Sequence, residues 1–174
     1  MNKIKILLLI LLLSITFIAC TANQDDIKFY LNPGNDTVEI NSVYVDPGVT
    51  AKVFNITRST EVVDNTVNTS EIGVYHITYN FLYKDFDLTL IRIVTVVDET
   101  PPEVILNPGV DTIKVGQTWE DASISVFDNS GGKINVSTSG SVNSELVGTY
   151  IITYIATDPS GNESSISRYI NVIE

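Results

Sequence analysis

The stretch LNPGNDT at residues 31–37 returns, with one substitution, as LNPGVDT at residues 106–112. The offset between the two copies is 75 positions, and the same offset relates GVYHITY at residues 73–79 to GTYIITY at residues 148–154. A constant offset over about fifty residues is typical of a supersecondary unit that has been duplicated in tandem. The sequence therefore predicts two small modules of similar fold.

Each module is expected to be built from short β-strands. We assign the first module to residues 27–97 and the second to residues 103–174. Their apolar segments are rich in β-branched residues, and turn-forming pairs such as Pro-Gly, Gly-Gly and Ser-Gly separate them. In the late segment of the second module, Tyr150, Ile152 and Tyr154 alternate onto one face, which should point to the core. About seven such strands a module predict an all-β fold of compact two-sheet sandwiches.

The linker between the modules is DETPP, residues 98–102. Its two prolines fix φ and remove two backbone donors, so the linker is expected to be extended and stiff rather than flexible. Two modules joined in this way should form a rod.

Residues 1–19 have the pattern of a secretory signal. Lys3 and Lys5 precede an apolar run that is shorter than the about 20 residues a membrane-spanning helix needs. The run ends in FIAC, which resembles the lipobox of bacterial lipoproteins, where the signal is cut before the cysteine and its sulfur receives a diacylglycerol. We therefore expect a lipoprotein signal peptide, a lipidated Cys20 and a tether over residues 20–26. The alternatives are an ordinary signal peptide followed by a chance thiol, or a retained anchor helix.

Composition excludes several classes of function. The chain has 10 basic and 21 acidic residues, and removing Lys3 and Lys5 with the signal leaves 8 basic residues and a net charge of −13. A surface this acidic repels nucleic acid, because phosphate binding needs clustered Lys and Arg. The single cysteine excludes an internal disulfide, and the single histidine, His76, excludes a metal site with two histidine ligands. No catalytic residue, metal ligand or cofactor is assigned, and we expect no enzymatic activity.

Several motifs of the second module resemble one family. TPPEVIL, VGQTW, VFDN, GTYIITYIATD, PSGN and RYINVIE, in that order, are similar to the bacterial immunoglobulin-like modules of cell-surface proteins and of some pesticidal crystal proteins. The first module shows VYVDPGVTA and RIVTVVD, but it departs from the pattern at Phe54 and Asn55 and at FLYKDFD, residues 81–87. The resemblance implies two tandem immunoglobulin-like β-sandwiches, a fold that hosts unrelated functions.

A few residues stand at positions where a specific role can be expected. Tyr75 and Tyr150 follow turn glycines at the start of a late strand, where sandwiches place a tyrosine whose hydroxyl bonds back to nearby backbone. Trp119 and Tyr44 are equivalent in the repeat, which favours core or edge packing over stacking on a sugar. His76 is equivalent to Ile151, and no special role is expected for it.

Weak calcium binding is an open alternative. Acidic and amide side chains occur in the linker and in two turns of the second module: Asp98 and Glu99, Asp128 and Asn129, Asp158 and Asn162. Calcium takes six to eight oxygen ligands, and extracellular modules bind it weakly. However, Asp and Asn in turns also cap backbone groups, and the sequence has no dense run of alternating acids.

The sequence thus favours a non-catalytic, lipid-anchored protein on the extracytoplasmic face of a bacterial cell membrane, serving as a binding or spacer module. One alternative is an adhesin that recognises a glycan or a host protein through loops at the far end, such as FDNSGGK at residues 127–133. Another is a structural accessory subunit of an envelope protein or enzyme.

Overall fold

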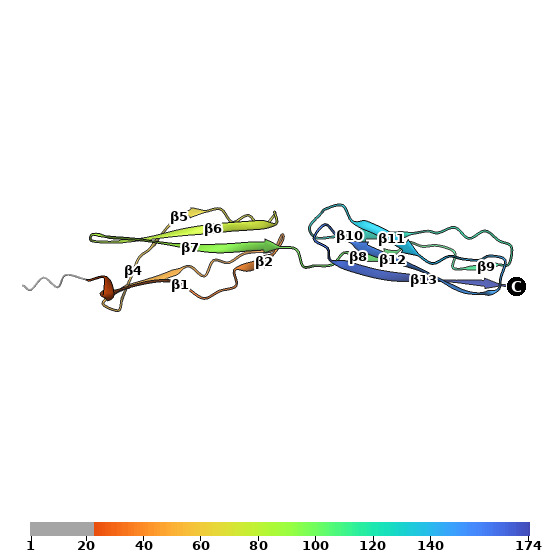
Figure 1. Ribbon diagram of the computed structural model, residues 1–174, viewed down its shortest axis with the longest axis horizontal. Coiled ribbons are helices and arrows are strands. Elements are labelled where there is room, and N and C mark those ends of the chain that lie inside the picture. Colours follow the sequence, from red (N-terminus) through yellow and green to blue (C-terminus); the bar gives the residue numbers. More distant parts are fainter. Residues whose placement is uncertain (1–22) are drawn as a thin grey trace, which may run out of the picture.

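The computed structural model describes residues 23–174, and Figure 1 shows that it is elongated. The first module consists of a 3-10 turn, η1 (Gln24–Asp26), and seven strands, β1 (Ile27–Leu31), β2 (Thr37–Glu39), β3 (Val49–Val53), β4 (Ile56–Arg58), β5 (Glu61–Asn65), β6 (Gly73–Tyr83) and β7 (Phe86–Val97). They form one sheet in the order β1-β3-β4 and a second in the order β2-β7-β6-β5.

The second module contains six strands, β8 (Glu103–Leu106), β9 (Thr112–Lys114), β10 (Ile124–Phe127), β11 (Asn135–Ser139), β12 (Gly148–Thr157) and β13 (Glu163–Ile173). Their sheets have the orders β10-β8 and β11-β12-β13-β9. The expected seventh strand is missing from the described residues because the counterpart of β4 falls on Gly131, Gly132 and Lys133. Gly131 has a φ of 74°, and glycines offer no side chain to pack in a strand.

Both modules use the same two kinds of pairing. A long antiparallel hairpin, β6 with β7 and β12 with β13, forms the centre of the larger sheet. A short strand near the start of the module then pairs in parallel with the last strand, β2 with β7 and β9 with β13. The second strand of each module, β2 or β9, therefore runs beside the last strand in the same direction.

The core of each module lies between its two sheets. In the first module, Ile77 and Tyr79 of β6 and Val94 of β7 are buried against Phe29 and other side chains of the opposite sheet. In the second, Ile152, Tyr154 and Ile170 form the matching cluster, with Leu106 and Ile124 packed on it. Because side chains alternate along a strand, one face of each hairpin supplies this core. The predicted inward direction of Ile152 and Tyr154 is confirmed.

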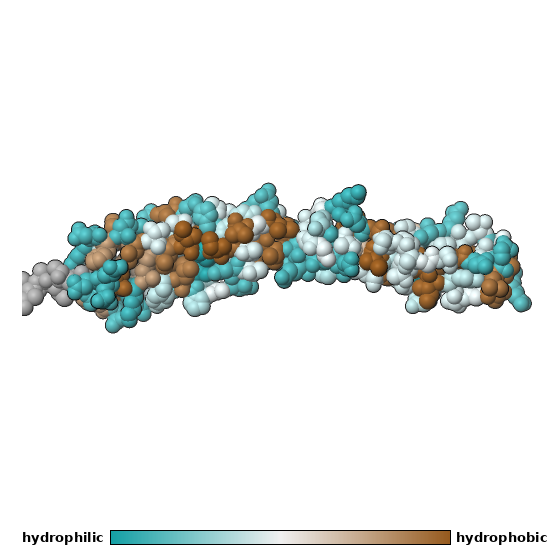
Figure 2. Space-filling view, in the orientation of Figure 1, coloured by the Kyte–Doolittle hydropathy of each residue, from teal (hydrophilic) through white to brown (hydrophobic). Residues whose placement is uncertain are grey.

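The two modules lie end to end (Figure 1), and the predicted all-β class is confirmed. The proposed signal peptide and Cys20 lie outside the described residues. Between residues 23 and 174 there is no helix with the length and apolar character needed to span a membrane. On the surface, Figure 2 shows a band of apolar residues over the first module, whereas the second module is more evenly polar in this view.

Candidate functional site

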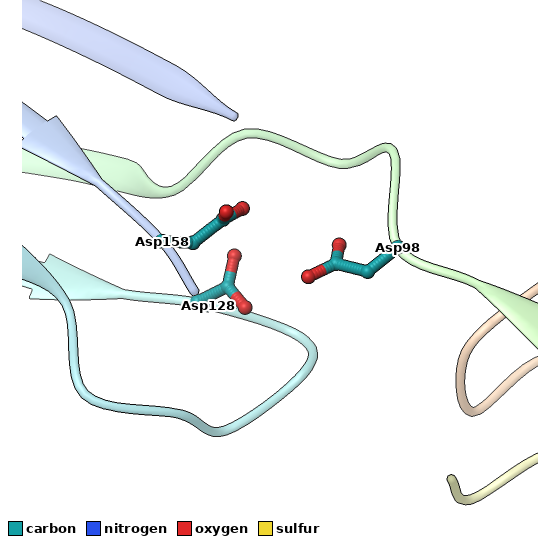
Figure 3. A group of neighbouring side chains, drawn as sticks. All are labelled: Asp98, Asp128 and Asp158. Carbon is teal, nitrogen blue, oxygen red and sulfur yellow. The ribbon is translucent and has the colours of Figure 1, made fainter. Parts of the chain in front are cut away.

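Three carboxylates meet where the linker enters the second module. Asp98 follows β7, Asp128 follows β10 and Asp158 follows β12, so one comes from the linker and two from loops of the second module. One oxygen of each lies within 4.8 Å of the oxygens of the other two, and the side chains converge on a common point (Figure 3). We call this group the acidic triad. It brings together the three aspartates that the sequence had singled out for calcium.

The triad is largely shielded from water. Asp98 is 8% and Asp158 is 3% exposed, and Asp128 is half-buried. Among the ion pairs found in residues 23–174, none joins a lysine or arginine to any member of the triad. Buried charges are normally paired with an opposite charge or bound to a metal. Three neighbouring carboxylates without a basic partner therefore form an electrostatically incomplete site.

Hydrogen bonds hold each carboxylate in place without neutralising it. Asp98 Oδ2 accepts from Ser160 Oγ at 2.8 Å, and Asp158 Oδ2 accepts from Asn162 Nδ2 at 2.8 Å. Burial acts to raise the pKa of Asp158, but hydrogen bonds from Asn162 and from backbone N–H groups outweigh it and lower this pKa, so the charged form is favoured.

Asp128 adds an unused ligand atom. Its Oδ1 accepts hydrogen bonds from the backbone N–H and the hydroxyl of Ser130. Its Oδ2 is inaccessible to solvent and has no hydrogen-bond partner. A buried polar atom left unpaired costs free energy, about 1–3 kcal/mol and more when it is charged. A hard cation that prefers carboxylate and carbonyl oxygens would remove that cost.

Side chains also link the two modules directly across the junction. Glu39, at the end of β2, accepts from the backbone N–H of Glu99 at 3.0 Å and from Asn129 Nδ2 at 2.8 Å. Asn41 Nδ2 donates to the carbonyl of Asn129 at 2.7 Å. Hydrogen bonds from the side chains of Thr100 and Asn129 lower the pKa of Glu39. Pro102 of the linker is fully buried. The junction is thus a packed, hydrogen-bonded contact.

These contacts correct one expectation. The sequence predicts that the loop of residues 127–133 lies at the far end of the molecule, as a free binding loop. Instead, Asn129 within it bonds to Glu39 and Asn41 of the first module. The reason is topological, since this loop follows β10 at the end of the second module that faces the linker.

A buried arginine in each module is a feature that sequence reasoning missed. Arg92, 1% exposed, donates from Nη1 to both oxygens of Asp36 at 2.8 and 2.9 Å and from Nη2 to the carbonyl of Asn32 at 2.7 Å. Arg168, 2% exposed, donates from Nη1 to Asp111 at 2.7 Å and from Nη2 to the carbonyl of Asn107.

The repeated LNPGxDT motif therefore supplies the acceptors of these arginines. Asn32 and Asp36 come from its first copy, and Asn107 and Asp111 from its second. The sequence did contain a signal for these two ion pairs. The aspartate of the motif and the arginine of the last strand both recur in the second module, at matching positions.

The two predicted tyrosine corners are confirmed. The hydroxyl of Tyr75 donates to the carbonyl of Glu71 at 2.9 Å, and that of Tyr150 donates to the carbonyl of Leu146 at 2.9 Å. His76 lies on β6, where its ring contacts Asp64 at 2.9 Å and Thr66 at 3.3 Å.

Trp119 and Tyr44 both pack on a core, as expected, but each also lines a cavity. Trp119 contacts the core of the second module, and its indole N–H donates to the carbonyl of Val110 at 2.9 Å. It lines a cavity of about 660 Å³ together with Gln117, Glu120 and Asp121. The equivalent cavity beside Tyr44 has about 370 Å³. Sequence alone did not indicate a cavity at either position.

The solved structures that are similar to this chain resemble it only weakly. No curated protein matches the chain. Among solved structures, a lipoprotein of Bacteroides thetaiotaomicron has 14% identity and a TM-score of 0.37, covering 81% of this chain and 78% of its own. The structure of protocadherin gammaB7 EC3-6 has 18% identity and a TM-score of 0.41, and the match covers 86% of this chain and 40% of that chain. The structure of human protocadherin-24 EC1-2 has 11% identity and a TM-score of 0.39, and the match covers 87% of this chain and 84% of that chain.

A family model described as "Bacterial surface protein, Ig-like domain" matches residues 110–172. This range begins just before β9 and ends within β13, so it includes Arg168, the tyrosine corner at Tyr150 and two members of the acidic triad. In its second module, the chain is therefore similar to the immunoglobulin-like domains of bacterial surface proteins.

Proposed function

We propose that this protein is a non-catalytic, lipid-anchored surface protein of a bacterium that serves as a binding or spacer module, and that its two modules form a rigid spacer. The observation that carries the proposal is the junction. Glu39 and Asn41 of the first module are hydrogen-bonded to the linker and to a loop of the second. A spacer must keep its parts in line, and a junction fixed by side chains from both modules supports that role.

The anchor part of the proposal rests on FIAC and can be tested by itself. Mass spectrometry of the protein purified from its own cells should find a mature chain that begins at Cys20 and carries a diacylglycerol on the sulfur. Cys20→Ser should release the protein from the membrane fraction. An uncleaved chain, or a mature chain with a free thiol, would disprove the anchor and leave the fold unaffected.

We further propose that the acidic triad binds a divalent cation, with calcium the best fit. Its donors are all oxygens, two of the three carboxylates are more than nine-tenths buried, and Asp128 Oδ2 lacks any partner. Three carboxylates provide part of the six to eight oxygens that calcium prefers, and water can provide others. Because Asp98 belongs to the linker and the other two aspartates to the second module, a bound ion would fix the linker to that module.

Calcium titration of the mature chain tests this proposal. At a calcium concentration of ten times Kd, the free energy of unfolding should rise by about 1.4 kcal/mol, and Tm should rise with it. Asp128→Asn should abolish the response, since it neutralises the carboxylate whose Oδ2 is unpaired. Asp85→Asn, in the exposed β6–β7 turn, is the matched control and should respond normally. An unchanged Tm at millimolar calcium would exclude the site.

A glycan-binding adhesin is the second candidate, and the cavity beside Trp119 favours it. A pocket that combines an aromatic ring with carboxylate and amide groups suits a sugar, which has one apolar face and many hydroxyls. Saturable binding on a glycan array, lost in Glu120→Lys and kept in the matched variant Glu103→Lys, would support recognition by this cavity. Absence of binding across the array would leave the spacer role alone.

A further inference from the structure

One end of the first module lies directly beside the beginning of the described chain. The backbone N–H of Phe54 donates to the carbonyl of Asp26 at 3.1 Å, and Lys28 Nζ donates to Asn55 Oδ1 at 3.3 Å. The turn between β6 and β7 reaches the same end, since Tyr83 packs on the cluster that includes Ile27. Figure 1 shows both turns at the same end of the first module as η1. We call residues 23–28, 52–61 and 82–87 the anchor-proximal end.

This end combines exposed apolar side chains with long basic ones. Phe54 is 40% and Ile56 is 57% exposed. The guanidinium of Arg58 lies 5.7 Å from the centre of the Tyr83 ring, and the ammonium group of Lys84 lies 5.6 Å from it. Aromatic rings next to lysine or arginine suit a lipid–water interface, because the ring and aliphatic stem enter the apolar layer while the charge stays at the headgroups.

Charge is distributed unevenly along the rod. Six basic side chains of the described chain are not buried. Four of these six belong to the anchor-proximal end: Lys28, Lys52, Arg58 and Lys84. This end also carries five acidic residues, Asp25, Asp26, Glu61, Asp85 and Asp87, so it is close to neutral. The rest of the described chain holds the other 16 acidic residues against four basic ones. Of the rod's parts, this end is repelled least by an anionic membrane.

The length of the tether brings the same end to the membrane. Three peptide units separate Cys20 from Asn23, and an extended chain spans at most about 3.5 Å for each residue. The described chain therefore begins within about 10 Å of the backbone of Cys20, the residue that would carry the lipid.

We propose that the anchor-proximal end is a membrane-contact surface, with Phe54 and Ile56 at the level of the lipid headgroups and Lys28, Arg58 and Lys84 against the lipid phosphates. The inference rests on the proposed anchor at Cys20. It assigns the rod an upright orientation, in which the acidic second module points away from the bilayer.

Fluorescence quenching in vesicles tests the contact. Residues 20–174 are coupled through the single cysteine to a maleimide-bearing phosphatidylethanolamine in vesicles of phosphatidylcholine and phosphatidylglycerol. The phosphatidylcholine is brominated close to its headgroup, so that it quenches nearby indoles. Phe54→Trp in a Trp119→Phe background reports on the proposed contact, and Ile56→Trp in the same background is a second reporter in case the first disturbs its turn. The unchanged chain, with Trp119 alone in the second module, is the control.

The expected result is a large loss of fluorescence at both reporters and none at Trp119. Unquenched indoles at both positions would overturn the contact while leaving the anchor intact, since coupling places the chain on the vesicle whether or not the cell lipidates Cys20. Natural lipidation is decided separately by the mass spectrometry described above.

Charge reversal tests the role of the basic residues. Arg58→Glu combined with Lys84→Glu should reduce the quenching of the Phe54→Trp reporter, whereas Lys114→Glu combined with Lys133→Glu, in the second module, should leave it unchanged. Equal quenching in both pairs would show that the cations of this end do not contact the lipid phosphates.

Discussion

The corresponding ends of the two modules have the same framework but opposite chemistry. The acidic triad stands at Asp98, Asp128 and Asp158, and the residues 75 positions earlier are Asn23, Val53 and Tyr83. Val53 is fully buried, and Tyr83 packs against the cluster that contains it. One end is thus a set of carboxylates facing the linker, and the other is an apolar cap facing the tether. The two modules therefore share their strands but differ at this end, which faces the tether in the first module and the linker in the second.

The two modules share a buried ion pair. Each has a buried arginine in its last strand and an aspartate of the repeated motif that binds it. The pairs differ in strength, because Arg92 contacts both oxygens of Asp36 and lies 3.5 Å from Asp46, whereas Arg168 contacts one oxygen of Asp111. The comparison separates residues that the fold needs from residues that the surroundings of each module select.

Placing a carboxylate at the apolar end of the first module, as the acidic triad does in the second, should have the largest effect on stability. Val53→Asp puts a charge at a fully buried site without a basic partner, which should destabilise the first module by about 4 kcal/mol. Urea unfolding followed by tyrosine circular dichroism measures this change. Trp119 fluorescence follows the second module and should be unaffected. Ile56→Asp, on the exposed strand nearby, is the control and should change stability by about 0.5 kcal/mol or less. An equally small effect of Val53→Asp would contradict the apolar cap.

Removing the shared arginines should have the next largest effect. Arg92→Met removes two hydrogen bonds to Asp36 and one each to the carbonyls of Asn32 and Gly48, and a loss of about 3 kcal/mol is expected. Arg168→Met should cost less, about 2 kcal/mol, because Asp111 accepts one bond and is half exposed. Unfolding curves from the same two probes compare the variants, with Lys114→Met as an exposed control. A larger loss in the second module would reverse the order that the contacts predict.

The tyrosine corners should show that the modules are alike. Tyr75→Phe and Tyr150→Phe each remove one hydroxyl-to-carbonyl bond of the same length, 2.9 Å. Each should therefore reduce stability by about 1 kcal/mol, as measured by thermal unfolding of the two variants. Clearly unequal losses would mean that only one of the corners supports its module.

Acid should have the smallest effect, on the alignment of the modules rather than on their folding. Glu39 and Asp158 have pKa values below their ordinary 4.5 and 3.8. A carboxyl group with a depressed pKa stabilises the folded form above its unfolded pKa and loses that contribution as the pH falls through the folded one. The junction should thus become flexible below about pH 4. Small-angle scattering at neutral and acid pH measures this, and Glu39→Gln should be less sensitive than the unchanged chain. An unchanged scattering curve would exclude these carboxylates as supports of the junction.

The sequence predicted the strands well and the site only in part. Alternation along residues 150–156 and the turn glycines before Tyr75 and Tyr150 are local signals, and the structure agrees with them. The aspartates at 98, 128 and 158 were recognised as candidates. Their convergence could not be predicted, because it depends on which loops the sheet topology brings to the same end. The partners of Arg92 and Arg168 were missed because a lone arginine in a strand usually indicates an exposed face.

The parallel pairing of β2 with β7 and of β9 with β13 has a mechanical consequence. A pull on the two ends of the rod acts on the start of each module and on its last strand. Because β2 and β9, near the start of each module, run beside the last strand in the same direction, tension slides one strand along the other and loads their hydrogen bonds together instead of opening them one at a time. Resistance to such a pull depends on the unfolding rate rather than on equilibrium stability. The short strands β2 and β9 therefore act as the mechanical clamps of the molecule.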